Sequence, residues 1–146
     1  MRFQLEAGVG AHPVKLGMKS DELRAVLKAV PKILKEGPDQ GQPGEDYERL
    51  GVTLFYRADG TLEAAVFNRK SLVIWEGRDC FKLGYAELAR VLEDLDPELE
   101  YDSAGCTSFK LGIGFFAPEC EENPEGPIDS VIAFAEGYYL RDEEVD

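Results

Sequence analysis

The stretch "RLGVTLFY" at residues 49–56 is echoed later in the chain by "KLGIGFFA" at residues 110–117. Each copy begins with a basic residue and Leu-Gly, and continues with a β-branched residue and an apolar pair. Glycine before such a run typically marks a bulge or a close approach of another backbone, and the run itself is typical of a β-strand. The echo therefore predicts an internal repeat with a strand at the same place in each copy.

A second echo precedes the first one in each copy. "VKLGM" at residues 14–18 matches "FKLGY" at residues 81–85, and an apolar stripe follows each. The stripes consist of Leu23, Val26, Leu27 and Val30 in the first copy and of Leu88, Val91, Leu92 and Leu95 in the second. This spacing lines one face of a helix, and Pro31 and Pro97 mark the helix ends. We therefore expect one amphipathic helix per copy, with its apolar face buried.

Strand patterns surround both predicted helices. "FQLEA" and "LVIWE" precede them, "VTLFY" and "LEAAVF" follow the first around an Asp-Gly turn, and "IGFFA" and "IDSVIAF" follow the second. This order predicts an α+β fold of two tandem strand–helix–strand–strand units, residues 1–70 and 71–146, with a pseudo-twofold relation. A unit of this size is marginal alone. We therefore expect one compact domain in which both helices pack on one face of an antiparallel sheet.

The composition is that of a globular protein. Of 146 residues, 44% are hydrophobic and 31% are charged, and no apolar run reaches the length of a signal peptide or a membrane span. The cysteines Cys80, Cys106 and Cys120 are widely spaced and form no CxxC motif, which disfavours a disulfide framework or a zinc site. We therefore expect a cytoplasmic protein with reduced thiols, no membrane association, no metal and no cofactor.

The stretch "LGMKSDELRAVL" at residues 16–27 resembles the Gly-Met-(Ser/Thr)-x-x-x-(Val/Leu) helix entry of the SmpA/OmlA (BamE) lipoproteins and of each half of the β-lactamase inhibitor protein. Lys19 stands where those families have a small hydroxyl residue, and Tyr85 replaces the methionine in the second half. The resemblance implies helices on one face of an antiparallel sheet and binding of other proteins without catalysis. In general character the chain is also similar to small acidic bacterial immunity proteins.

Charge is distributed unequally between the two copies. Residues 1–70 contain eleven Lys/Arg and ten Asp/Glu, whereas residues 71–146 contain five and nineteen. Nearly all of the formal net charge of −13 therefore belongs to the second copy. A duplicated fold with equal structural needs does not require this difference. We therefore expect the second copy to carry the binding function, with a basic protein as its partner.

The acidic residues of the second copy gather in residues 93–102, in residues 118–127 and in the tail "RDEEVD". Segment 118–127 stands where the first copy has only a tight turn, and long loops commonly carry binding function. Nearby aromatic residues are expected to supply anchoring contacts. The candidate partner-binding residues are Asp94, Asp96, Glu98, Glu100, Tyr101, Asp102, Glu119, Glu121, Glu122, Glu125, Tyr138 and Tyr139.

Other functions find less support in the residues. His12 is the only histidine, and it has no nucleophile signature beside it, so we expect no catalysis. An EF-hand loop counted from Asp94 would need glycine and glutamate where the chain has Leu99 and Gly105. Phosphate repels a chain of net charge −13, which argues against nucleic-acid binding.

Two interpretations of function follow. The first is a non-enzymatic protein-binding module, an immunity-type inhibitor that engages a basic partner through its acidic second half. The alternative is a module that binds a small ligand or a metal ion in a cleft between the two repeats, lined by Trp75 and carboxylates. The residues do not determine the oligomeric state.

Overall fold

The computed structural model describes residues 1–34 and 43–138. Its larger sheet has eight strands, and every neighbouring pair is antiparallel. In spatial order these strands are β10 (Glu100–Asp102), β11 (Gly105–Ser108), β12 (Ile113–Phe116), β13 (Ser130–Phe134), β7 (Leu62–Asn68), β6 (Val52–Tyr56), β5 (Glu45–Tyr47) and β4 (Lys32–Ile33). The last strands of the two halves, β7 and β13, pair at the centre, so both halves build one continuous sheet.

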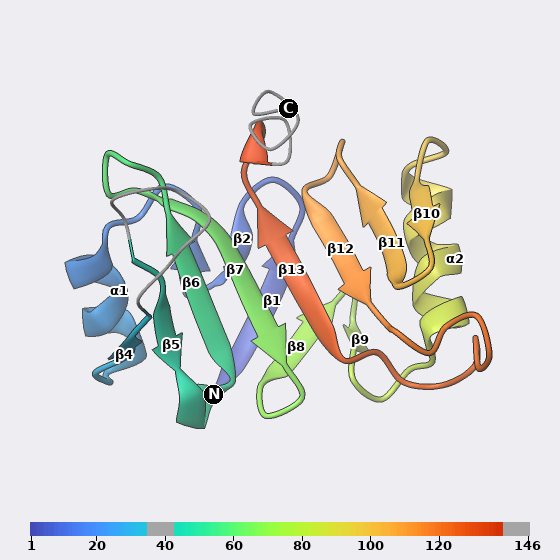
Figure 1. The fold of residues 1–146 in the computed structure, drawn as a ribbon, viewed down its shortest axis with the longest axis horizontal. Coiled ribbons are helices and arrows are strands. Elements are labelled where there is room, and N and C mark those ends of the chain that lie inside the picture. Colours follow the sequence, from blue (N-terminus) through green and yellow to red (C-terminus); the bar gives the residue numbers. More distant parts are fainter. Residues whose placement is uncertain (35–42, 139–146) are drawn as a thin grey trace.

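A smaller sheet of five strands forms part of the second layer. Its order is β3 (Val14–Lys15), β2 (Gly10–His12), β1 (Arg2–Glu6), β8 (Leu72–Trp75) and β9 (Arg78–Asp79). The helices are α1 (Ser20–Leu27) and α2 (Tyr85–Leu95), and a 3₁₀ turn, η1 (Glu48–Leu50), links β5 to β6. In Figure 1 the small sheet lies behind the central strands of the large sheet, with α1 towards one end and α2 towards the other.

The expected α+β fold of two strand–helix–strand–strand units is wrong. The described residues form thirteen strands in two sheets and only two short helices, so the protein is mostly β. Four strands follow each helix instead of two, because polar segments such as Glu45–Tyr47 and Glu100–Asp102 pair as short strands. The halves meet antiparallel at β7–β13 but parallel at β1–β8, so the single twofold relation that we expected does not generate both pairings.

The two Leu-Gly steps have the same structural role. Gly51 before β6 and Gly112 before β12 have φ angles of 73° and 69°, which glycine adopts without steric cost. The Gly51 carbonyl accepts a hydrogen bond from the Asn68 N–H at 2.9 Å, and the Gly112 carbonyl accepts one from the Phe134 N–H at 3.0 Å. A Cβ at either glycine would collide with these neighbours. The predicted close backbone approach is therefore confirmed.

The start of each helix is tied to the hairpin loop of its own half. The Met18 carbonyl before α1 accepts a hydrogen bond from the Leu62 N–H at 2.7 Å, and the Tyr85 N–H of α2 donates to the Gly126 carbonyl at 2.8 Å. Leu62 opens β7, whereas Gly126 lies in the long loop between β12 and β13. The tight turn and the long acidic loop therefore occupy corresponding places.

The first three positions of each helical stripe contribute to the core as predicted, whereas the last positions, Val30 and Leu95, are exposed. Leu23, Leu27, Leu88 and Leu92 are buried, and the two valines between them, Val26 and Val91, are half-buried against the core. Val30 is 88% exposed because α1 ends before it. Among the described residues, neither helix is long and apolar enough to cross a membrane.

Aromatic contacts join the two layers. Phe3 of β1 and Phe67 of β7 have ring centroids 4.9 Å apart, and Trp75 of β8 and Phe115 of β12 have centroids 5.4 Å apart. All four rings are almost completely buried. Rings of this size dominate the apolar area that a core removes from water, so these contacts hold the small sheet against the large one.

Candidate functional site

The acidic residues of segment 93–102 lie at one end of the large sheet. β10 is its terminal strand, and α2 lies beside it (Figure 1). The chain leaves α2, turns at residues 96–99 and returns as β10. Four predicted carboxylates are exposed along this border, and we call them the acidic edge: Asp94, Glu98, Glu100 and Asp102.

The acidic loop between β12 and β13 begins against the same end of the sheet. The Ala117 N–H donates to the Ala104 carbonyl at 2.7 Å, and the Cys120 thiol donates to the Ser103 carbonyl at 3.5 Å. The loop is thus attached to the β10–β11 turn, next to Asp102. Its predicted carboxylates are all exposed, and they are Glu119, Glu121, Glu122 and Glu125. The fold therefore brings the two internal acidic segments to one side of the second half.

Three of the predicted residues are not part of this surface. Asp96 is 2% exposed, and its carboxylate accepts hydrogen bonds from the Ser108 hydroxyl at 2.7 Å and from the Glu98 N–H at 3.0 Å. Asp96 therefore secures the turn after α2 and is not available to a partner. Tyr138 follows β13, three strands away from β10, and packs on Phe134 with centroids 6.1 Å apart. Tyr139 lies outside the described residues.

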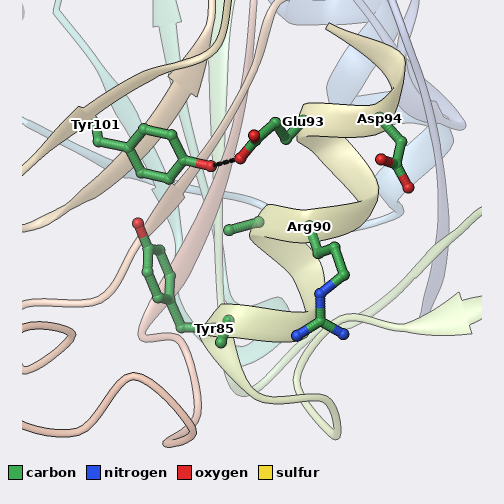
Figure 2. A pocket seen from close by; sticks show the side chains of 7 residues that line it. Tyr85, Arg90, Glu93, Asp94 and Tyr101 are labelled. Carbon is green, nitrogen blue, oxygen red and sulfur yellow. Dashed lines mark hydrogen bonds between the residues drawn. The ribbon is translucent and has the colours of Figure 1, made fainter. Parts of the chain in front are cut away.

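A groove of about 440 Å³ lies between α2 and β10, and we call it the α2–β10 groove. Its lining consists of Tyr85, Ala86, Ala89, Arg90, Glu93, Asp94 and Tyr101. The helical positions lie one turn apart, so they form one stripe along α2. Figure 2 shows the rings of Tyr85 and Tyr101 on the same side of the helix as Glu93, whereas Arg90 and Asp94 extend away from the two rings.

The two tyrosines give the groove neutral aromatic walls. The Tyr101 hydroxyl donates a hydrogen bond to Glu93 Oε2, although Tyr101 is 52% exposed. Partial burial, followed by this hydrogen bond, raises the pKa of Tyr101 to about 12. Tyr85 is 7% exposed, and burial raises the pKa of its hydroxyl. Both phenols therefore stay protonated at neutral pH beside the carboxylates of α2.

In the first half a buried carboxylate joins the helix to the large sheet. Glu45 of β5 is 4% exposed and accepts hydrogen bonds from the Ser20 hydroxyl at 2.7 Å, from Arg24 at 2.8 Å and from the Tyr56 hydroxyl. The hydrogen bond and charge of Glu45 raise the pKa of Arg24, and burial followed by the hydrogen bond to Glu45 raises that of Tyr56. These four residues, the Glu45 cluster, tie α1 to the large sheet.

The ion pairs between described residues are also distributed unequally between the two halves. They are Arg24–Glu45 at 2.8 Å and Arg57–Glu63 at 3.3 Å, and both lie in the first half. Within residues 1–34 and 43–138, the carboxylates of the acidic edge and of the β12–β13 loop form no ion pair. Their charge is therefore not neutralised by a neighbouring described side chain.

No three His, Cys, Asp or Glu side chains of the described residues come together as metal ligands. Two further cavities of about 200 and 230 Å³ lie beside β11 and β12 and beside β5 and η1. The residues that line each of these cavities, like those that line the α2–β10 groove, come from one half of the chain. Trp75, which we expected to line a cleft between the halves, is 3% exposed and packs in the core.

Sequence reasoning missed the residues that shape both polar sites. Tyr85 and Glu93 are separated by about two helical turns and therefore lie on one side of α2, a spacing that was a usable signal. Glu45 alternates with Tyr47 in "EDY", but a strand of three residues is too short for its period to be recognised.

Comparisons with models of protein families, with curated proteins and with solved structures found no match to this chain. The resemblance to the SmpA/OmlA (BamE) lipoproteins and to the β-lactamase inhibitor protein therefore rests on the helix entry alone and stays a prediction.

Proposed function

We propose that this chain is a non-enzymatic protein-binding module that engages a basic partner through its acidic second half, as an immunity-type inhibitor in the cytoplasm. The acidic edge is the observation that carries the proposal. Its carboxylates are exposed, form no ion pair with a described cation, and lie beside a groove with aromatic walls. Charged surfaces of this kind accelerate encounter with a partner of opposite charge.

Anchoring and steering would fall to different parts of the same surface. Tyr101 offers a large, half-exposed ring on β10, and a few aromatic residues usually dominate the binding energy of an interface. The carboxylates of the β12–β13 loop are exposed, and exposed charges at the rim of an interface mainly affect the association rate. In the first half, Glu45 is not available in this way, because its carboxylate is already bound inside the protein.

The test is charge reversal in the full chain. Asp94, Glu98 and Glu100 are changed to lysine in one variant, and Glu6, Asp21 and Glu48, which are exposed in the first half, are changed in a matched control. The native protein captures its partner from an extract of its own cells, and the association rate is then measured at low and high salt. We expect the first variant to associate about tenfold more slowly at low salt, and the control to change little.

Two results would contradict the proposal. Equal slowing in both variants would mean that only the total charge matters. If no basic protein is captured at all, the acidic edge serves as solvated surface, and the alternative of a small-ligand module is favoured.

A further inference from the structure

The outer side of β10 is a free sheet edge. β10 pairs with β11 through Glu100–Thr107, Tyr101–Cys106 and Asp102–Gly105, and no described strand pairs with its other side. All three residues of β10 are exposed. A strand at such an edge presents N–H and C=O groups that can pair with another chain, so the backbone of β10 can accept one more strand.

The side chains of β10 alternate between the two faces of the sheet. Tyr101 pairs with the buried Cys106 and reaches Glu93 of α2, so it lies on the helix side. Its neighbours Glu100 and Asp102 point to the opposite face, because successive side chains of a strand alternate. An added strand would therefore place every second side chain into the α2–β10 groove and the others next to the carboxylates of Glu100 and Asp102.

The chemistry of the groove favours basic side chains. The rings of Tyr85 and Tyr101 and the small side chains of Ala86 and Ala89 accommodate the aliphatic part of lysine or arginine. Glu93 lies on the same side of α2 as the two rings, where it can meet the cationic group, and Arg90 is the single cation among the described residues that line the groove. Charge complementarity thus points to a basic segment rather than to a second copy of this chain, whose own edge carries carboxylates.

We propose that β10 binds an extended basic segment of the partner as an additional strand, with alternate lysine or arginine side chains in the α2–β10 groove. This proposal rests on the proposed function and specifies how the basic partner is recognised. Main-chain hydrogen bonds supply affinity in this mode of recognition, and the pockets for alternate side chains supply specificity.

The test uses a fluorescent seven-residue peptide of alternating lysine and threonine, and two versions of it that are N-methylated on the odd or on the even residues. All three carry the same charge. Binding to the full-length protein is measured by fluorescence anisotropy at low salt. In an added strand only alternate N–H groups face β10, so we expect one methylated peptide to bind at least about tenfold more weakly and the other to bind like the parent.

The groove is tested with Ala86→Trp, which fills it, and with Ala25→Trp as a matched control on the exposed side of α1. Ala86→Trp should weaken binding of the parent peptide at least about tenfold, as loss of the groove contacts requires, and Ala25→Trp should not. Circular dichroism of both variants confirms that they fold.

The outcomes separate this inference from the proposed function. If both methylated peptides bind like the parent, strand addition is wrong. Strand addition is also wrong if the parent peptide does not bind while binding of the captured partner still depends on Asp94, Glu98 and Glu100. In both cases the acidic edge remains the binding surface. If the peptide does not bind and the partner is indifferent to charge reversal, both proposals are wrong. Peptide-free dimers in analytical ultracentrifugation would show that a second copy occupies β10 and would overturn the inference.

Discussion

Each half of the protein contains a tyrosine that donates a hydrogen bond to a glutamate at the place where its helix meets the large sheet. The surroundings of the two pairs are opposite. Tyr56 and Glu45 are 3% and 4% exposed, and Glu45 also binds Ser20 and Arg24 of α1. Tyr101 is 52% exposed, and Glu93 is exposed on α2. The same pair chemistry is thus enclosed in the first half and open to solvent in the second.

The difference shows how burial assigns a role to a polar pair. A buried carboxylate is costly unless its hydrogen bonds are satisfied, so the Glu45 cluster must be complete and contributes to the stability of the α1 end. An exposed pair contributes little to stability and can exchange its partner at low cost. The Tyr101–Glu93 pair of the second half therefore stays open to solvent, whereas Asp96 of the same half is enclosed and hydrogen-bonded.

The largest expected effect is a loss of stability when a buried leucine of either helix is truncated. Comparing the two helices tests whether apolar contacts anchor both equally. Leu27→Ala in α1 and Leu88→Ala in α2 should each lower the free energy of unfolding by about 2–5 kcal/mol, since both leucines are buried in the core. Urea denaturation followed by circular dichroism measures this. A loss below about 0.5 kcal/mol for either variant, the size of an ordinary surface change, would show that this helix is held by something other than its stripe.

The next prediction compares the two glutamates directly. Glu45→Ala should lower the free energy of unfolding by about 2–4 kcal/mol, because the buried Tyr56 hydroxyl and the Ser20 hydroxyl lose their acceptor. Glu93→Ala should change it by less than about 0.5 kcal/mol, as is usual for an exposed site. The same denaturation experiment measures both variants, and similar values for the two would remove the contrast between the halves.

A smaller effect should appear in alkaline solution. Burial raises the pKa of Tyr47 to about 12, whereas an unfolded chain loses this proton near the ordinary tyrosine value of about 10. The stabilising contribution is therefore complete below about pH 10 and is lost as the pH rises through about 12. Denaturation at a series of alkaline pH values should show stability falling over this interval. Tyr47→Phe should reduce the slope, and Tyr101→Phe should reduce it less, because solvent screens the exposed Tyr101.

The smallest effect concerns the interior of the second half. Burial raises the pKa of Cys80 to about 12 and that of Cys106 to about 11, so neither thiol is ionised at neutral pH. In the native protein both should react slowly with a thiol reagent, and all three cysteines should react after denaturation without reductant. Rapid native labelling of Cys80 or Cys106 would mean that the second half opens well beyond its edge.

The local features of this protein could be predicted from the sequence. The apolar stripes place Leu23, Leu27, Leu88 and Leu92 on buried helix faces because helical periodicity is a property of neighbouring residues. The Leu-Gly steps predicted the close approaches at Gly51 and Gly112, since only the absence of a side chain allows them. The unequal charge of the two halves required no structure at all.

The tertiary structure decided which distant residues became neighbours. Short polar segments became the strands β5 and β10 because adjacent strands supplied their hydrogen bonds, and this changed the fold from the expected α+β units to a mostly β protein. Asp96 and Glu98 are two residues apart in one acidic run, yet only Asp96 faces Ser108 and is buried. The burial of a charge depends on packing from other parts of the chain, and no local pattern encodes it.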